Sequence, residues 1–436
     1  MATVNSVLSI RKLKAMQLQS LFCGLLVACA VQPEVEGTTV QVYLDTANAP
    51  TRSLTGILHG GNNASPPTDL ITPLGISQWR NRDVLMYPRI NELGAVDMFI
   101  LLSGWGGGTA NGYPYDNPTG WVSAVSSVAT STVGQNFFWD GWNEPDWPGR
   151  WAGTEQQLAD TYALSYKTIK TIKPNDKIGG PSISKYDLTR ITNFLNYALQ
   201  NGVQVNFVSW HELNNDSNIP SIKKHVDEIR KNFIDNPVYA ALNIQGVSIN
   251  EYVGQGSQYS PGDILGYLYY LELSRVEYAS KSCWPGFAGP SNCNNFTLGG
   301  LITPNTFLPR SSWWAFKLYA DGWKTRVLST STDQFVNGLA NTTSTGAQVL
   351  VAVYGKADVT KVCKLKLNKI SFLPGFSSDS LVKIDVKKLP NSLEAPLDVP
   401  VSVQSYEVRA ANDSLTLTLP TLSLHEAYIV TISKGN

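Results

Sequence analysis

The sequence has 436 residues, which is more than one ordinary domain needs and fewer than three would take. Hydrophobic residues make up 43% of the chain, enough for a large core, and the 34 basic residues equal the 34 acidic ones. Because proteins that bind nucleic acids usually carry a basic excess, this balance argues against a nucleic-acid partner.

The N-terminal residues have the features of a secretory signal peptide. A basic segment (residues 11–14) precedes an apolar run (21–27) and a stretch of small residues suited to cleavage (28–30). The apolar run is too short to cross a bilayer, and no later stretch reaches about 18 apolar residues. We therefore predict a cleaved signal peptide over residues 1–30, a secreted, extracellular protein and no membrane span.

From residue 50 to 322, apolar strand-like runs alternate with helix-like segments, and this alternation predicts parallel βαβ units. The predicted strands cover residues 54–58, 75–79, 96–102, 137–142, 177–180, 207–210 and 244–249, with the eighth marked by Trp284. The predicted helices cover residues 84–93, 121–133, 155–172, 191–199, 222–233, 264–279 and 311–320. About eight such units fit a catalytic (β/α)8 TIM barrel. An open doubly wound sheet is less well supported, because the glycine-rich run at 104–108 lacks the spacing of a phosphate-binding fingerprint.

Residues 323–436 have a different sequence pattern from the barrel region. They form short β-rich segments bounded by Asn, Gly, Ser and Pro, a pattern that predicts an accessory antiparallel β-sandwich domain. Residues 38–46 also alternate like a strand, but they come too early in the chain for the barrel. We expect this strand to complete the sandwich.

The strongest chemical signal is Glu144, which follows the predicted strand 137–142 in the run WNEP. The carboxyl ends of barrel strands hold the active site. Indole rings from Trp139, Trp142 and Trp147 would partly desolvate a carboxylate there. Desolvation raises the pKa of a carboxyl group, which suits a general acid.

Glycoside hydrolysis uses two carboxyl groups, and Glu251 is the best second candidate. It follows the apolar residues 246–249 in the run GVSINEYVG, again at a predicted carboxyl end. Glu144 ends the fourth predicted strand and Glu251 the seventh. If the enzyme retains anomeric configuration, we expect the two carboxyl groups about 5–5.5 Å apart.

These two motifs, Trp-Asn-Glu-Pro at 142–145 and Asn-Glu-Tyr at 250–252, resemble the catalytic motifs of glycoside hydrolase clan A. Within the clan the chain is most similar to family 39, which includes β-xylosidases. Gly-Gly-Pro at 179–181, Phe-Val-Ser-Trp-His at 207–211 and the trailing β-sandwich carry this closer resemblance. It implies a retaining β-glycosidase that works by double displacement.

The resemblance also implies roles for individual residues. Glu144 would be the acid/base and Glu251 the nucleophile. Asn143 would bind the hydroxyl next to the anomeric carbon, Arg80 would support the nucleophile's charge, and His211 would line the site. Further substrate-binding candidates near predicted strand ends are Tyr252, Trp105, Trp147, Trp210 and Trp284.

The chain departs from the family's pattern at two positions. Asp140 stands where the family often has Glu, and Leu213 stands where it often has Tyr. We therefore expect a substrate pocket that differs from that of a xylosidase.

The cysteines and sequons agree with secretion. Cys283 and Cys293 bracket a loop rich in Pro, Gly and Asn, which predicts a local disulfide and leaves Cys363 as a buried free thiol. Predicted N-glycosylation sites are Asn63, Asn215, Asn295, Asn341 and Asn412.

Other chemistries are poorly supported by the sequence. The four histidines are scattered, and neither a zinc-binding motif nor a nucleophile elbow nor a P-loop occurs, so we predict no metal and no cofactor. The expected partner is an oligo- or polysaccharide. A transglycosylase, which would share the covalent intermediate, and a non-catalytic carbohydrate-binding barrel are the alternatives. Two glutamates at these positions argue against the second, while the sugar, the linkage, exo or endo action and the oligomeric state stay open.

Overall fold

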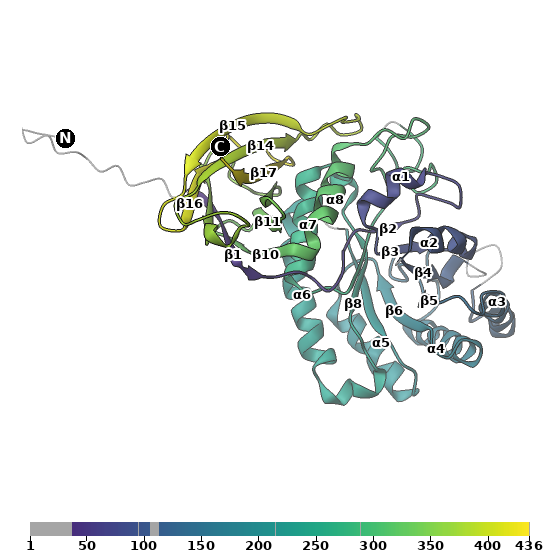
Figure 1. Cartoon of the computed structure of the whole chain (residues 1–436). Coiled ribbons are helices and arrows are strands. Elements are labelled where there is room, and N and C mark those ends of the chain that lie inside the picture. Colours follow the sequence, from purple (N-terminus) through teal and green to yellow (C-terminus); the bar gives the residue numbers. More distant parts are fainter. Residues whose placement is uncertain (1–36, 95, 105–112, 214, 288, 436) are drawn as a thin grey trace, which may run out of the picture. The chain divides into compact units, whose positions relative to one another are not determined.

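The structure, a computed structural model, contains a closed barrel and a separate β-sheet (Figure 1). It describes residues 37–94, 96–104, 113–213, 215–287 and 289–435. The barrel consists of eight parallel strands, β2 to β9, and the sheet of nine strands. The predicted (β/α)8 TIM barrel is confirmed, and the accessory domain predicted as an antiparallel β-sandwich is a mostly antiparallel β-domain whose strands form one sheet.

The barrel strands pair in chain order, and β9 closes the ring against β2. They are β2 (Gly56–Leu58), β3 (Gln78–Asn81), β4 (Asp97–Leu101), β5 (Phe137–Asp140), β6 (Lys177–Ile183), β7 (Phe207–Glu212), β8 (Val247–Tyr252) and β9 (Tyr278–Lys281). An aromatic cluster packs at the level where β7 and β9 begin, with ring centroids 4.6 to 6.2 Å apart. Its members are Phe99, Phe138, Phe207 and Tyr278. The barrel is therefore a packed core whose chemistry lies at the carboxyl ends of its strands.

The helices that follow the strands are amphipathic or largely buried. They are α1 (Thr68–Ile71), α2 (Tyr87–Leu93), α3 (Pro118–Ser131), α4 (Glu155–Ile172), α5 (Leu188–Gln200), α6 (Ser221–Ile229), α7 (Pro261–Leu273) and α8 (Ser311–Gly322). The start of α4 shows how the sequence sets a boundary. Thr154 and Gln157 form a capping box, in which each side chain accepts a hydrogen bond from the other residue's backbone N–H at 3.2 and 2.8 Å. The helix ends before Pro174, which cannot continue it.

The boundary between α7 and β9 differs from the prediction. The pattern predicted a helix over residues 264–279 and a last strand at Trp284, but α7 ends at Leu273 and β9 spans Tyr278–Lys281. A turn stops the helix early: Arg275 adopts a left-handed conformation with φ of 57°, and the N–H of Val276 donates to the carbonyl of Leu271 at 3.0 Å. Trp284 therefore lies in the loop after the last barrel strand.

The accessory domain is one continuous sheet in the order β15-β14-β17-β12-β11-β10-β1-β13-β16. Its strands are β1 (Thr38–Ala47), β10 (Arg326–Ser331), β11 (Val336–Thr343), β12 (Gly346–Val353), β13 (Cys363–Asn368), β14 (Leu381–Leu389), β15 (Val401–Arg409), β16 (Ser414–Thr418) and β17 (Ala427–Lys434). The strand β1 pairs antiparallel with β10 and parallel with β13. Because β1 enters from a distant part of the chain, no tight hairpin ties its direction to that of β13.

The sheet packs on the barrel through α7 and α8, which contact β11 and β12. Figure 1 shows α7 and α8 next to β11. Two glycines allow the close approach. Gly262 donates its backbone N–H to the carbonyl of His425 at 3.0 Å, and a Cβ at Gly266 would lie 2.5 Å from the ring of Tyr354.

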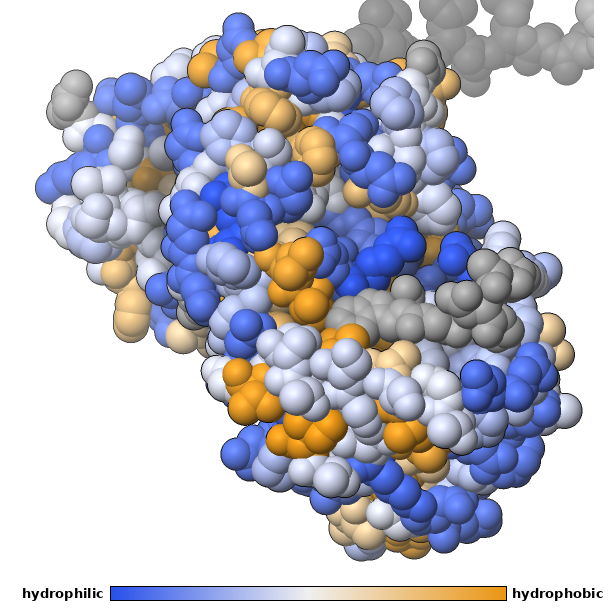
Figure 2. Space-filling view, turned by 90° about the vertical axis from the view of Figure 1, so that its right-hand side faces the viewer, coloured by the Kyte–Doolittle hydropathy of each residue, from blue (hydrophilic) through white to orange (hydrophobic). Residues whose placement is uncertain are grey.

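No helix among the described residues is both long and apolar enough to cross a bilayer. On the face that Figure 2 shows, apolar side chains form small patches between hydrophilic ones.

Candidate active site

The carboxyl ends of the barrel strands surround a cleft with a volume of about 410 Å³. The residues that line it come from the carboxyl ends of several strands and from the loops that follow, as expected for a site at this end of a barrel. They are Leu58, His59, Arg82, Leu101, Ser103, Asn143, Glu144, Arg150, Glu251, Cys283, Trp284, Ser291, Cys293 and Asn294.

Glu144 and Glu251 meet in this cleft on either side of His211. One carboxylate oxygen of each glutamate and one ring nitrogen of His211 all lie within 4.8 Å of one another. His211 Nδ1 is 3.1 Å from Glu144 Oε1, and its Nε2 is 3.7 Å from Glu251 Oε1. The histidine is fully buried, while both carboxylates keep some exposure, with side chains 13% and 11% exposed. The two carboxyl groups can therefore reach one ligand from opposite sides.

Arg80, in β3, donates hydrogen bonds to three residues of the site. Its Nη1 donates to Glu251 Oε1 at 2.7 Å, its Nε and Nη2 donate to Asp140 Oδ2 at 2.9 and 2.7 Å, and its Nη2 also donates to Asn143 Oδ1 at 2.8 Å. Burial alone would lower the pKa of Arg80, but Asp140 and Glu251 outweigh it, and the pKa is raised above its ordinary value. The guanidinium is thus a fixed positive charge beside Glu251.

Asp140 is the second anchor of the site. It is completely buried and accepts hydrogen bonds from Arg80, from Asn250 Nδ2 at 2.7 Å and from the hydroxyl of Ser182. Asn250 Nδ2 also donates to Ser182 Oγ at 2.7 Å. Removing one partner of a buried ion pair typically costs about 3–5 kcal/mol, so this network fixes the geometry of the cleft floor.

The backbone of Glu144 is in the left-handed region, with φ of 51°. Its N–H donates to the carbonyl of Ser182 at 2.9 Å, and its own carbonyl accepts from Trp147 N–H at 3.0 Å. A residue other than glycine in this conformation carries strain of about 1–3 kcal/mol, and such strain concentrates at functional positions. The neighbouring strand and the turn after Glu144 keep the side chain turned into the cleft.

The pKa of Glu144 is lowered, so the expected net rise of this pKa is wrong for this state of the site. Burial, the largest single effect, does raise it, but the hydrogen bond and charge of His211 and the charges of Arg150 and Arg80 together outweigh burial. Nη2 of Arg150 lies 3.9 Å from Glu144 Oε2.

The predicted indole walls also differ from the expectation. Trp139 points away from the cleft and donates its indole N–H to Asp176 Oδ2 at 2.7 Å, while Trp147 is 57% exposed. Trp142 is buried and donates its indole N–H to the carbonyl of Arg150 at 3.2 Å.

The other aromatic candidates separate into two groups. Trp284 lines the cleft, and its indole N–H donates to the carbonyl of Val253 at 2.9 Å. Trp210 and Tyr252 are fully buried outside the cleft: Trp210 donates to Glu212 Oε1 at 2.7 Å, and the Tyr252 hydroxyl donates to a backbone carbonyl at 3.1 Å.

The placement of this second group follows from strand geometry. Trp210 and Tyr252 each stand next to a site residue, and successive side chains of a strand point to opposite faces. Both rings therefore belong to the packing behind the strands. Trp105 lies outside the described residues.

His59, Arg82 and Arg150 line the cleft but were missed in the sequence. Burial mainly lowers the pKa of His59 to about 4, and the charges of Arg82 and Arg80 lower it further, while a hydrogen bond with Asn81 opposes them. His59 is therefore neutral at neutral pH. Its position one residue after the first barrel strand was the only signal that could have identified it.

The predicted disulfide between Cys283 and Cys293 is present, with the two Cα atoms 5.1 Å apart. It packs against Leu58 and Leu101 and forms part of the cleft wall. Cys363 is a buried free thiol, and burial raises its pKa to about 12.

The sequons differ in accessibility. Asn341 lies in β11, only 3% exposed, so its side chain is not accessible for glycosylation in the folded chain and that prediction is not supported. Asn63, Asn215 and Asn412 are exposed, and Asn295 is half-buried.

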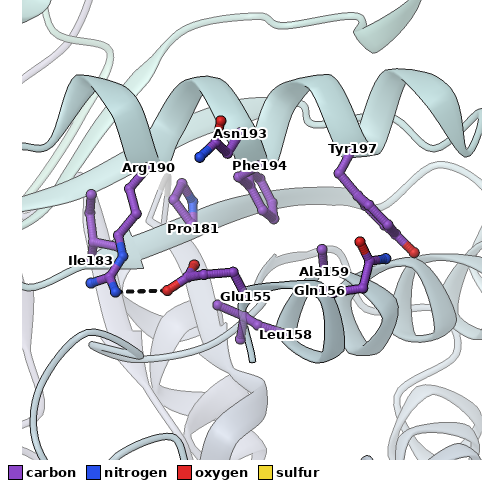
Figure 3. Close-up of a pocket in the computed structure, with 10 residues that line it drawn as sticks. All are labelled: Glu155, Gln156, Leu158, Ala159, Pro181, Ile183, Arg190, Asn193, Phe194 and Tyr197. Carbon is purple, nitrogen blue, oxygen red and sulfur yellow. Dashed lines mark ion pairs between the residues drawn. The ribbon is translucent and has the colours of Figure 1, made fainter. Parts of the chain in front are cut away.

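A second, smaller pocket of about 110 Å³ lies between α4 and α5, on the outer surface of the barrel (Figure 3). An ion pair of 2.7 Å between Arg190 and Glu155 crosses it. None of the residues that line it lines the cleft.

Two clusters among the described residues combine carboxylates and histidine closely enough to hold a metal ion. One consists of Glu144, His211 and Glu251, and the other of Asp216, Asp263 and His425. In the first, Arg80 already donates to Glu251, which opposes a second cation at that carboxylate.

The comparisons with known proteins agree with this geometry. Residues 123–245 match the family model described as glycosyl hydrolases family 39. The predicted resemblance to glycoside hydrolase family 39 is confirmed over these residues. A β-xylosidase from Geobacillus stearothermophilus is 32% identical over 71 residues, which is 16% of this chain and 14% of that protein.

Several solved structures share the fold of this chain. The structure of N2152 from Neocallimastix frontalis has a TM-score of 0.76 at 20% identity, covering 92% of this chain and 100% of that one. A GH39 enzyme from Xanthomonas axonopodis pv. citri has a TM-score of 0.64 at 16% identity, covering 94% and 100%. At these identities the likeness describes the architecture alone.

Proposed function

We propose that the protein is a secreted glycoside hydrolase that retains anomeric configuration, with Glu144 as the acid/base and Glu251 as the nucleophile. The observation that carries the proposal is the approach of one oxygen of each carboxylate to within 4.8 Å in a family 39 barrel. Retaining enzymes need carboxyl groups about 5–5.5 Å apart, whereas inverting enzymes place them about 6.5–9.5 Å apart to admit a water molecule.

In the first step, Glu144 gives its proton to the leaving oxygen while Glu251 attacks the anomeric carbon and forms a glycosyl-enzyme. In the second step, Glu144 takes a proton from water, the water oxygen bonds to the anomeric carbon, and the bond to Glu251 breaks. Arg80, 2.7 Å from Glu251 Oε1, orients the nucleophile and balances its charge. His211 orients Glu144 through the contact at Oε1.

The substrate is an oligo- or polysaccharide with a β-linkage. Asn143 Oδ1 is engaged by Arg80, and its amide nitrogen makes one long hydrogen bond of 3.5 Å to Glu144 Oε2, so its second N–H can donate to the hydroxyl next to the anomeric carbon. Trp284 on the cleft wall and the exposed Trp147, three residues after Glu144, offer faces on which sugar rings stack. Asp140 and Leu213 differ from the residues common in the family, which supports a sugar preference other than that of a xylosidase.

Secretion is proposed from three features that agree. The first is the signal-like pattern over residues 1–30, the second is the disulfide between Cys283 and Cys293, and the third is the exposure of the sequons at Asn63, Asn215 and Asn412. Secretion of the full-length chain from a eukaryotic host, with loss of the first residues shown by mass spectrometry, tests it.

A panel of aryl β-glycosides, followed by natural oligosaccharides, tests the activity. We expect release of the aryl group, and proton NMR of the first product should show the β-anomer before mutarotation. First formation of the α-anomer would indicate inversion, and no turnover of any glycoside would support the non-catalytic alternative. Products longer than the substrate in the presence of acceptor sugars would identify a transglycosylase.

A further inference from the structure

Arg150 occupies a position in the cleft that the proposed reaction does not explain. Its side chain is 56% exposed, lines the cleft, and places Nη2 3.9 Å from Glu144 Oε2. Its backbone is fixed, because its N–H donates to the carbonyl of Trp147 at 3.0 Å and its carbonyl accepts from the indole of Trp142 at 3.2 Å. The guanidinium therefore extends over the cleft from an ordered turn.

The two oxygens of Glu144 show which side of the cleft Arg150 faces. Oε1 is engaged by His211 at 3.1 Å, whereas Oε2 has only the longer contact with Asn143 Nδ2 at 3.5 Å, so Oε2 is the freer oxygen to protonate a leaving group. Arg150 lies next to Oε2, whereas Arg80 lies next to Glu251, on the side of the anomeric carbon. Arg150 thus borders the space for the leaving part of the substrate.

A cation at this point works against general acid catalysis of a neutral substrate. The charge of Arg150 is one of the causes that lower the pKa of Glu144, together with His211 and Arg80. A general acid must carry a proton, and a nearby positive charge favours its loss. At 3.9 Å, with Arg150 largely exposed, the contact is also too long for a hydrogen bond and contributes little to stability.

An anionic group on the substrate would neutralise the charge of Arg150 and so remove its effect on the proton of Glu144. It would pair with the guanidinium, for which planar carboxylate and sulfate groups are well-matched partners, and it would offset the positive charge beside Glu144. The other charged groups that act on Glu144 are His211 from β7, Glu251 from β8 and Arg80 from β3, and Arg82 also lines the cleft.

We infer that the cleft prefers glycosides whose leaving part carries a carboxylate or a sulfate ester, bound by Arg150. The inference rests on the proposed hydrolase activity and names a substrate class for it. The anionic group selects the substrate and, once bound, favours the protonated form of the general acid.

The test uses matched aryl glycosides of whichever sugar the full-length enzyme accepts. The leaving groups are 3-carboxyphenol, 3-sulfooxyphenol and the uncharged 3-carbamoylphenol. We expect kcat/KM for at least one charged substrate to exceed that for the neutral one by about tenfold, the size of one charge-assisted hydrogen bond. The arm with the larger ratio distinguishes a carboxylate from a sulfate preference.

Arg150→Gln should bring the ratio of charged to neutral kcat/KM close to one. Arg190→Gln is the matched control, because Arg190 lies on α5 at the pocket between α4 and α5, outside the cleft (Figure 3), and should leave the ratio unchanged. The alkaline limb of kcat, which reports Glu144 in the complex, should lie at higher pH for the charged substrate. Faster turnover of the neutral substrate by the unmodified enzyme, or a ratio unchanged in Arg150→Gln, would overturn the inference.

Binding to Glu251→Ala protein, measured by calorimetry, separates this inference from the proposed function. Tighter binding of the charged glycoside, lost in the double variant with Arg150→Gln, supports the anion preference even if no substrate is hydrolysed. Equal binding of charged and neutral glycosides contradicts it even if hydrolysis is fast.

Discussion

Two clusters in the described chain have the same composition and very different surroundings. Each contains one histidine and two carboxylates whose ligand atoms lie within 4.8 Å of one another. The cleft triad consists of Glu144, His211 and Glu251, and the contact triad consists of Asp216, Asp263 and His425. The cleft triad lines or underlies the 410 Å³ cleft and includes Glu251, which accepts a hydrogen bond from the buried Arg80.

The contact triad joins the barrel to the β-domain. His425, just before β17, places Nδ1 2.8 Å from Oδ1 of Asp263 on α7 and 3.7 Å from Oδ2 of Asp216. Asp263 is 1% exposed, and burial raises its pKa despite the hydrogen bond from His425. The hydrogen bond to Asp263 in turn raises the pKa of His425, against the effect of burial.

The comparison shows that residue types alone do not identify a catalytic site. The contact triad uses the charge of its histidine to accommodate a buried carboxylate between two domains. The cleft triad leaves two partly exposed carboxylates facing one space, with the additional charge of Arg80 on one of them. Access to a ligand and an extra cation, rather than the composition of the cluster, support the catalytic assignment.

Substituting one carboxylate in each triad should have very different effects on kcat, and the effect should be largest at the proposed nucleophile. We expect Glu251→Ala to lower kcat by about 10⁴-fold or more, because no covalent intermediate can form. The matched change in the contact triad, Asp263→Asn, should change the melting temperature but not kcat per folded molecule. Steady-state kinetics on aryl glycosides and calorimetric melting measure both. A Glu251→Ala enzyme with ordinary activity would remove the proposed nucleophile.

Removing the acid/base should have a smaller effect that depends on the leaving group. Glu144→Ala is expected to lower kcat/KM by about 10²- to 10⁴-fold for poor leaving groups and much less for good ones, which need little protonation. Added azide should restore turnover and give the β-glycosyl azide. Azide acting on Glu251→Ala should give the opposite anomer, and identical products from the two variants would contradict the assigned roles.

The contact triad should affect the pH dependence of the melting temperature rather than the catalytic activity. The pKa of His425 is raised in the folded state above 6.5, so its contribution is present below about pH 6.5 and is lost as the pH rises through the folded pKa. We expect a larger loss of melting temperature between about pH 5.5 and about pH 9 for the unmodified protein than for His425→Gln. Equal pH dependence in both proteins would show that the triad does not act as this link.

The sequence predicted the architecture and the placement of Glu144 and Glu251 in one cleft because both depend on local signals. Strands buried on both faces give continuous apolar runs; Glu144 lies four residues after β5, and Glu251 is the penultimate residue of β8. The end of α7 was predicted wrongly because the apolar pattern continues through the turn at Arg275. The parallel pairing of β1 with β13 was not predicted because it joins segments far apart in the chain.

The supporting residues of the site were less predictable than the glutamates. His59 reaches the cleft only through the fold, and Arg150, although six residues after Glu144, belongs to no recognised motif. Trp210 and Tyr252 were assigned to the cleft from proximity in sequence, although strand alternation directs them away from it. The lowered pKa of Glu144 depends on cations from three different segments, so burial inferred from neighbouring tryptophans gave the wrong sign.

The smallest expected effect concerns the pH dependence of the cleft triad. Arg150 is one of the charges that lower the pKa of Glu144, so Arg150→Gln should raise that pKa toward its ordinary value. With a neutral aryl glycoside, the alkaline limb of kcat/KM reports loss of the proton from the acid in the free enzyme. That limb should therefore move to higher pH in Arg150→Gln and stay in place in Arg190→Gln. The shift should shrink at high salt, because Arg150 is largely exposed and its charge is screened. A limb that moves to lower pH would mean that Arg150 does not act on Glu144 through its charge, and that the group titrating in this limb lies elsewhere.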